Sequence, residues 1–402
     1  MSLLNILGFL RPKTKPFTAW QVELTTRCPL SCRMCIREEA EGWLSGDMRI
    51  EDFKKILPYL RNVETVVLEG WGESLLHKDI IRIIRLVKAE GPKAGFVTSG
   101  RVLNSEYVSE LIDADVDFIG FSLSGTTPLT HDSIRLNSDL RSLTENIQTF
   151  NKIKAERGKE NPRLHIIFLM VRDNISEIPS LPEFAKDIGI EEIVLINLIH
   201  VTNEWQEKQR VFRCNVNSGH GSECHSRESG NPEKKANWIP VFTGMTGKEL
   251  QYDDNKDYEE ILKEAEAKAK ELKIKFRGHP LSPVDVGVCE EYPLSNLYIS
   301  VDGEVSPCVY LYPPVPSPFE RIFCGNACKI EKVSFGNIFK EPFESIWNNR
   351  DYIEFRERFL QRKKRFEEIF SPWNLGKLRG IENISLPGPP VQCRTCHKML
   401  GV

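Results

Sequence analysis

The 402-residue sequence lacks a long apolar run and lacks any extended block of one charge. Its 54 basic and 57 acidic residues give a net charge of -3, so we expect neither a nucleic-acid groove nor a basic membrane-binding patch. The apolar stretch within residues 1–15 covers only about ten residues, too short to span a bilayer, and has no signal-peptide features. These absences predict a cytoplasmic protein with no nucleic-acid or membrane partner.

Cysteine, in contrast, is plentiful, with 11 residues. Thiols in the cytoplasm are kept reduced, so we do not expect these cysteines to form disulfides. Their clustering along the chain instead indicates metal binding.

Six short apolar runs in the first half of the chain lack alternation between apolar and polar residues, as is typical of strands buried on both faces. They cover residues 19–24, 65–69, 94–98, 118–122, 163–170 and 192–198. Segments with helical apolar spacing lie between them. The pattern predicts an α/β fold with a parallel sheet or partial barrel, in which functional residues gather at the carboxyl ends of the strands.

The length of the chain favours more than one domain. We expect an N-terminal extension (1–17), the strand–helix series (18–200), a linker (201–285) and a C-terminal domain (286–402). Within the linker, residues 213–247 are rich in Gly, Ser, Asn and Pro and resemble peptides translated from dispersed genomic repeats, so we interpret them as an inserted surface loop before a charged helix at 258–273. An alternative is a zinc site made by Cys214, His220, Cys224 and His225.

Three cysteines directly follow the first predicted strand: Cys28, Cys32 and Cys35, with three and two residues between them. A 4Fe-4S cluster takes four thiolates, so three ligands leave one iron open to another molecule. A zinc site would need a nearby histidine, and none lies between Thr25 and Gly70.

This cysteine triad resembles that of the radical S-adenosylmethionine (SAM) superfamily. The resemblance implies a partial (βα)6 TIM-like barrel and a 4Fe-4S cluster whose open iron binds the amino and carboxylate groups of SAM. It also implies a low-potential electron donor, such as ferredoxin or flavodoxin, and a 5'-deoxyadenosyl radical that abstracts hydrogen from the substrate. Met34 stands where the family carries a large apolar residue near the adenine.

Further residues at strand ends resemble the SAM-binding motifs of that family. The segment Gly70-Trp71-Gly72-Glu73-Ser74 is similar to the Gly-Gly-Glu-Pro motif, with Trp71 inserted and Ser74 replacing proline. Its carboxylate is expected to hold the ammonium of SAM, although a plain strand-to-helix turn is the alternative. The other residues expected to contact SAM are Thr98, Ser99, Ser122, Ser124, Arg135 and Asn174, of which Ser124 stands where Asp is usual. Taken alone, Ser122 and Arg135 are typical of ordinary capping and surface residues.

The C-terminal cysteines form a second pattern. Cys289 and Cys308 flank two predicted strands joined by an Asp302-Gly303 turn, and Cys393 and Cys396 form a Cys-x-x-Cys pair near the end. The order resembles the SPASM/twitch auxiliary domain of radical SAM enzymes. It implies that these four cysteines hold a second 4Fe-4S cluster, for electron transfer or structural support, with a zinc knuckle as the alternative. Cys324 and Cys328 are left without a role.

The leading hypothesis is therefore a radical SAM oxidoreductase or maturase that modifies a peptide or protein side chain. Small-molecule or cofactor biosynthesis with the same radical initiation is the second hypothesis, and a non-catalytic zinc-binding interaction protein is the third. Asp285, Glu290 and Glu291 offer carboxylates near Cys289, but solvated surface residues are the more typical interpretation. The sequence does not choose a substrate.

Overall fold

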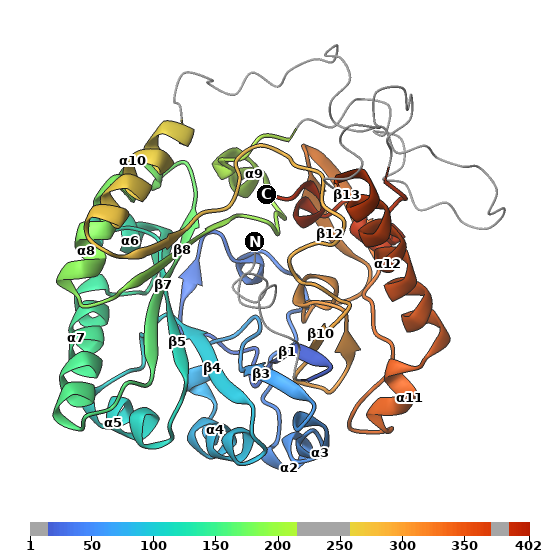
Figure 1. The fold of residues 1–402 in the computed structure, drawn as a ribbon, viewed down its shortest axis with the longest axis horizontal. Coiled ribbons are helices and arrows are strands. Elements are labelled where there is room, and N and C mark those ends of the chain that lie inside the picture. The colour runs from blue at the N-terminus through green and yellow to red at the C-terminus, as the bar shows by residue number, and fades with distance from the viewer. Residues whose placement is uncertain (1–14, 215–257, 371–385) are drawn as a thin grey trace.

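The computed structural model describes residues 15–214, 258–370 and 386–402 (Figure 1). Most of the predicted N-terminal extension and of the repeat-like insertion lie outside the described residues. The same holds for His220, Cys224 and His225 of the alternative zinc site.

All six strands predicted in the first half are present and parallel to one another, which confirms the α/β class. They are β1 (Phe17–Val22), β3 (Val63–Val67), β4 (Lys93–Thr98), β5 (Phe118–Leu123), β7 (Arg163–Met170) and β8 (Glu192–Asn197). They form a curved sheet with helices on its outer side (Figure 1). Strands covered on both faces need apolar side chains on both faces, which explains why these runs do not alternate.

The outer helices bury one apolar face each. In α4, Ile80, Ile83, Ile84 and Val87 are spaced so that they share one face of the helix, and all four are buried. The helices of the first half are α2 (Ile50–Phe53), α3 (Leu57–Leu60), α4 (Ile80–Ala89), α5 (Ser105–Asp113), α6 (Pro128–Ile134), α7 (Leu140–Glu156), α8 (Leu181–Asp187) and α9 (Glu204–Gln209). The charged helix predicted at 258–273 is α10 (Tyr258–Glu271).

The C-terminal part of the chain extends the same sheet, which the sequence did not indicate. The strand β9 (Lys275–Arg277) pairs with β8 at one edge, and β10 (Asn296–Ile299) pairs in parallel with β1 at the other. The strand β11 (Val305–Ser306) then pairs antiparallel with β10, which confirms the predicted Asp302-Gly303 hairpin. The nine-stranded sheet therefore runs β11-β10-β1-β3-β4-β5-β7-β8-β9.

Two small sheets and two C-terminal helices complete the described fold. The pair β2 (Ser31–Cys32) and β6 (Arg135–Leu136) is antiparallel, as is the hairpin of β12 (Phe319–Phe323) and β13 (Asn326–Ile330). The helices are α11 (Phe343–Trp347) and α12 (Arg350–Phe370).

An aromatic cluster attaches α11 to the first strand. The rings of Phe17 and Trp347 are 4.9 Å apart between centroids, and those of Trp20 and Phe343 are 4.6 Å apart. Trp20 is fully buried, and burying each such ring contributes on the order of 2 kcal/mol. The C-terminal part is thus packed against β1, the strand that leads to the cysteine triad.

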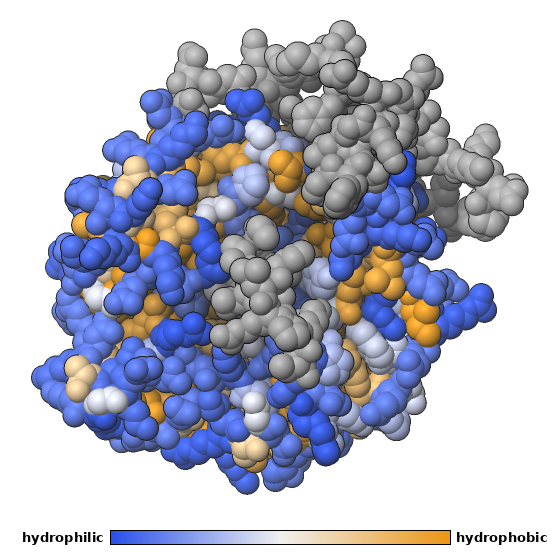
Figure 2. All heavy atoms as spheres, in the orientation of Figure 1, coloured by the Kyte–Doolittle hydropathy of each residue, from blue (hydrophilic) through white to orange (hydrophobic). Residues whose placement is uncertain are grey.

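On the face drawn in Figure 2, hydrophilic side chains dominate the outer rim, and hydrophobic ones are more frequent inside it. Within the described ranges no helix is both long and apolar enough to cross a bilayer.

Candidate active site and metal centres

The cysteine triad lies in the loop that follows β1. The Arg37 guanidinium donates to the carbonyl of Cys28 at 2.7 Å and to that of Leu30. The Cys35 amide donates to the Cys32 carbonyl at 2.9 Å. These bonds fold the loop back on itself, so that three thiols from eight consecutive residues face one small region.

Burial dominates the electrostatics of the triad. Together with smaller contributions it raises the pKa of the Cys28 thiol to about 12 and that of Cys35 to about 11; Glu73 and Cys32 contribute to the rise for Cys28, and Cys32 contributes for Cys35. Burial also raises the pKa of Cys32, against the opposing charge of Arg135. Such thiols keep their protons at neutral pH unless a metal replaces them, so the donor set fits an iron-sulfur cluster with one iron left open.

Glu73 stands at the end of the second barrel strand and is held rigidly. The Thr98 hydroxyl donates to its Oε1 at 2.7 Å, and the Ser99 amide and hydroxyl donate to its Oε2 at 2.8 and 2.7 Å. Glu73 is almost fully buried and close enough to Cys28 to raise the pKa of that thiol. The structure thus brings three predicted site residues together, with Thr98 and Ser99 orienting the carboxylate.

Gly70 and Gly72 allow the Glu73 loop to pack against the segment that enters the cysteine loop. A Cβ on Gly72 would lie 2.2 Å from the carbonyl oxygen of Thr25, and one on Gly70 would lie 2.4 Å from Oε1 of Glu23. The Glu73 amide also donates to the Arg27 carbonyl at 2.8 Å. Close backbone contact of this kind requires glycine and fixes Glu73 relative to the triad.

Arg135 lies in β6, after α6, and the pairing of β6 with β2 sets Arg135 opposite Cys32. Its Nε donates to the Ser124 hydroxyl at 2.9 Å. Ser124 is fully buried, and its carbonyl accepts from the Asn174 amide group at 3.1 Å. Asn174 also bonds the backbone of Leu169 and Val171, so its side chain holds the chain behind Ser124.

Met34 and Ser122 occupy different surroundings. Met34 is buried in a small apolar cluster that is separate from the main core, with Ile134, Val171, Leu198 and Val201. Cys32 of the triad packs against this cluster. Ser122 is half-buried on β5.

The second cysteine set also comes together. Cys289, Cys308, Cys393 and Cys396 lie close enough for their thiols to influence one another. Burial raises the pKa of Cys289 to about 12 and those of Cys308 and Cys393 well above their usual value. Cys289 and Cys393 are buried, and Cys308 and Cys396 are partly buried. Four thiols are a complete ligand set for a 4Fe-4S cluster.

A charged cluster lies beside this second set and was not anticipated. The Lys398 ammonium forms ion pairs with Glu290 at 3.2 Å and Glu291 at 3.1 Å. The expectation that these two glutamates are solvated surface residues is therefore wrong: their side chains are only 15% and 23% exposed. Burial opposes the charge of Lys398, yet Glu291, Tyr310 and Glu290 raise its pKa well above the usual value.

Glu69, two residues after the end of β3, was also missed, although its position near the carboxyl end of a strand is a signal the sequence carries. Burial raises its pKa to about 7, and the nearby charges of Glu291 and Glu73 raise it as well. The charge of Glu73 also raises the pKa of Cys28, and that of Glu291 raises the pKa of Cys289 and Cys308, so Glu69 is influenced by one carboxylate from each centre.

Aromatic rings lie near Glu69 and Glu291, whose charges both act on Tyr310. Trp71 contacts His200 with ring centroids 5.3 Å apart, and Tyr310 stacks on His200 at 6.1 Å. Among the described residues, Trp71 Nε1 and His200 Nε2 are buried polar atoms with no hydrogen-bond partner. Such atoms suit a polar ligand better than an apolar one.

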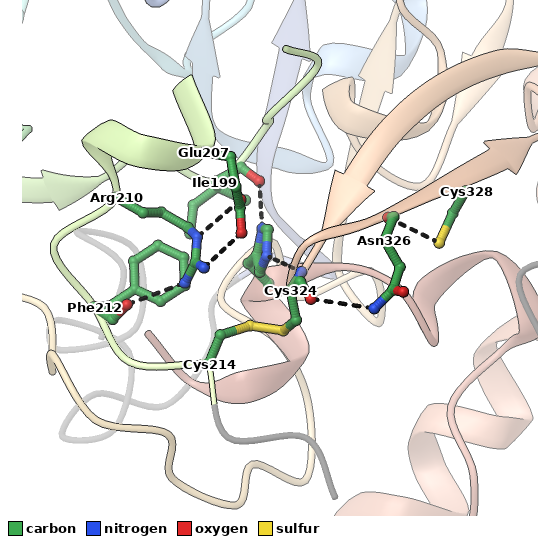
Figure 3. Close-up of a disulfide and its surroundings, with 9 residues drawn as sticks. Ile199, Glu207, Arg210, Phe212, Cys214, Cys324, Asn326 and Cys328 are labelled. Atoms are coloured by element: carbon green, nitrogen blue, oxygen red, sulfur yellow. Dashed lines mark hydrogen bonds and ion pairs between the residues drawn. A yellow bond between two sulfur atoms is a disulfide. The ribbon is translucent and has the colours of Figure 1, made fainter. Parts of the chain in front are cut away.

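The expectation that no cysteines form disulfides is wrong for Cys214, Cys324 and Cys328. Cys214, in the segment after α9, and Cys324, at the turn between β12 and β13, are joined by a disulfide (Figure 3). The fold brings their Cα atoms to 5.5 Å, a usual separation for a disulfide. The sequence could not show this proximity, because 110 residues separate the two cysteines.

Comparisons with known proteins agree with this arrangement. Residues 22–185 match the family model of the radical SAM superfamily, and residues 289–397 match that of an iron-sulfur cluster-binding domain, SPASM. The chain is 26% identical over 340 residues to the tungsten-containing aldehyde ferredoxin oxidoreductase cofactor-modifying protein of Pyrococcus furiosus, covering 83% of this chain and 82% of that protein. It is 23% identical to the AdoMet-dependent heme synthase of Methanosarcina barkeri, with the same coverage.

Solved structures show the same fold. Streptococcus suis SuiB bound to SAM superposes with a TM-score of 0.54 at 13% identity, covering 85% of this chain and 68% of that one. The enzyme anSMEcpe with bound AdoMet and a peptide superposes with a TM-score of 0.54 at 12% identity, covering 86% and 84%. The chain belongs to the radical SAM superfamily and carries a C-terminal SPASM domain, with a SAM-binding 4Fe-4S cluster and an auxiliary cluster.

Proposed function

We propose that this enzyme modifies a small polar molecule of the cofactor class, and that Glu69 accepts a proton from it. The observation that carries the proposal is the connected series of charges from Glu73 through Glu69 to Glu291 and Lys398. One end of the series acts on a cysteine of the triad and the other on cysteines of the auxiliary set, and the series includes carboxylates and an ammonium. Trp71 and His200 add two buried polar ring atoms that have no hydrogen-bond partner among the described residues. Such a set can bind and orient a compact polar substrate.

The relatives that align over most of the chain support a small substrate. The names of two of them describe cofactor modification and heme synthesis, and each alignment covers 83% of this chain. We therefore place small-molecule chemistry ahead of peptide modification, which the sequence alone favoured.

Glu69 has the properties of a general base. When bound, the cofactors supply a hydrogen-abstracting radical and an electron acceptor. Oxidation of the resulting substrate radical then requires that a proton leave together with an electron. A carboxyl with a pKa of about 7 is well matched to accept that proton near neutral pH.

The substrate class can be tested with deuterium. Reconstituted enzyme, SAM and dithionite are incubated with either the low-molecular-mass fraction or the peptide fraction of an extract from source cells grown in heavy water. Deuterium in 5'-deoxyadenosine reports hydrogen abstraction from a substrate. We expect label from the low-molecular-mass fraction, and label from the peptide fraction alone would overturn the proposal.

The role of Glu69 is tested by Glu69→Gln with the substrate so identified. Product formation should fall by roughly 10²- to 10⁴-fold while 5'-deoxyadenosine still forms, because the change removes only the base. Since a base acts when deprotonated, wild-type product formation should rise as pH increases through about 7. Glu110→Gln, on the exposed face of α5, is the matched control and should change neither quantity.

A peptide substrate is the second candidate. Its support is structural: the superposed SuiB and anSMEcpe structures include complexes with peptides. The deuterium experiment separates the two candidates directly.

A further inference from the structure

We propose that Cys214, Cys324 and His397 form a third metal site, which binds one divalent thiophilic ion such as Zn²⁺. The site is separate from both cysteine sets assigned above, and the proposal does not depend on the substrate. It gives a role to Cys324, which the sequence left unassigned.

The geometry brings three suitable ligand atoms together. The sulfurs of Cys214 and Cys324 and a ring nitrogen of His397 all lie within 4.8 Å of one another. The three residues come from distant segments: the stretch after α9, the turn of the β12–β13 hairpin, and the short helix that follows Cys396. Two thiolates and one imidazole are a usual donor set for zinc, with a fourth position left for water or another ligand.

The orientation of His397 is the second observation. Its Nδ1 lies 2.9 Å from the carbonyl oxygen of Ile199, so Nδ1 carries the hydrogen and donates it. Nε2 is then left with its lone pair and has only a long contact, at 3.4 Å, with the Cys324 amide. An imidazole that donates to a backbone carbonyl through one nitrogen and offers the other is the arrangement found at metal-binding histidines. A disulfide alone makes no use of this nitrogen.

The observed disulfide is the oxidised form of the same site. A dithiol reductant gives two electrons and two protons to the Cys214–Cys324 bond and itself becomes a disulfide, which leaves two protein thiols. Binding of the divalent ion then releases those two protons, and the two thiolates balance its charge. Both forms tie the segment after α9 to the β12–β13 hairpin, as Figure 3 shows for the disulfide.

The proposed metal site should also stabilise the ligands of the auxiliary cluster. His397 directly follows Cys396, and Arg321 of β12 donates to the Gln392 carbonyl at 2.7 Å, beside Cys393. A metal that fixes His397 and the hairpin therefore restrains the Cys-x-x-Cys turn from both sides.

The test uses full-length holoenzyme, purified anaerobically with a dithiol and supplied with zinc and iron. Elemental analysis should find about one zinc per chain besides the iron of two clusters. Zinc-edge X-ray absorption should show two sulfurs at about 2.3 Å and at least one nitrogen at about 2.0 Å. Cys214→Ser should lose the zinc and keep the iron.

Cys328→Ser is the control, because Cys328 lies on the same hairpin and is itself disulfide-bonded, but it is outside the three-residue set. It should keep the zinc. Loss of about four irons from Cys214→Ser would mean a third cluster and overturn the proposal. A Cys214–Cys324 disulfide that persists after dithiol treatment, with no zinc bound, would overturn it as well. Neither result would bear on Glu69.

Discussion

The two cysteine sets differ in how the chain assembles them. Cys28, Cys32 and Cys35 come from one loop, are half-buried, and are held by hydrogen bonds within that loop and to its neighbours. The second set joins Cys289 and Cys308, which flank the β10–β11 hairpin, to Cys393 and Cys396 at the far end of the chain. One site is local, and the other forms only when the whole C-terminal part has folded.

Their surroundings differ in the same way. The triad faces Glu73 and Arg135, two groups that suit the ammonium and carboxylate of an amino acid. The second set is enclosed with the Lys398–Glu291 pair and has a full complement of thiols. The first is therefore built to share its iron with a ligand, and the second is built to exclude one.

The largest expected effect comes from removing one cysteine ligand from each set, because the two losses should have different consequences. Cys35→Ala should abolish formation of 5'-deoxyadenosine from SAM, because the loop loses one of only three ligands. Cys393→Ala should lower the iron content by about four atoms and keep cleavage of SAM. Iron content and nucleoside formation in anaerobically reconstituted protein measure both outcomes.

If Cys35→Ala retained nucleoside formation, or if Cys393→Ala lost it while the iron of the triad remained, the division of roles between the two sets would be wrong.

The second prediction concerns the carboxylate beside the triad. Glu73→Gln removes a negative charge and turns an amide group toward the donors of Thr98 or Ser99. A charge-assisted hydrogen bond contributes about 1.5–3 kcal/mol, so the dissociation constant for SAM should rise roughly 10- to 100-fold. Equilibrium dialysis with labelled SAM, without reductant, measures this directly.

Glu304→Gln is the matched change near the second set. Glu304 accepts hydrogen bonds from Ser334 and from Asn337, at 2.5 and 2.8 Å, and supports the β10–β11 hairpin. It should leave SAM affinity unchanged. If Glu73→Gln and Glu304→Gln lowered the affinity for SAM equally, SAM binding would depend on the general stability of the protein and not on Glu73.

The site around Cys28, Cys32 and Cys35, which is built from one loop, was also the one that the sequence could predict. Strand positions and the triad spacing follow from neighbouring residues; Thr98 is the last residue of a strand, and Glu73 and Ser99 follow strand ends. The contacts of Lys398 with Glu290 and Glu291 could not be predicted, because they require the chain end to return across more than 100 residues. The pairing of β10 with β1 and the contact between Cys214 and Cys324 were missed for the same physical reason: nothing in a local pattern specifies a distant partner.

The smallest expected effect tests the backbone contact that positions Glu73. Gly72→Ala would place a Cβ 2.2 Å from the Thr25 carbonyl, so the two loops must separate. Overpacking of this kind costs about 1–3 kcal/mol, and part of that cost should appear as a severalfold weaker affinity for SAM. Gly303→Ala strains the hairpin of the second set instead, since Gly303 has a φ of +86° and an added Cβ would lie 2.4 Å from the Phe339 ring.

Gly303→Ala should therefore lower the unfolding temperature about as much while leaving the dissociation constant for SAM unchanged. Gly46→Ala is the control for both, because a Cβ there meets nothing within 4 Å. For each variant, the change in the dissociation constant for SAM is divided by the change in unfolding temperature. If Gly72→Ala and Gly303→Ala weakened SAM binding equally for the same loss of stability, the triad loop would not be positioned locally. The triad loop would then not be independent of the C-terminal region. SAM binding at the triad and the stability of the second set would both depend on the one sheet that they share.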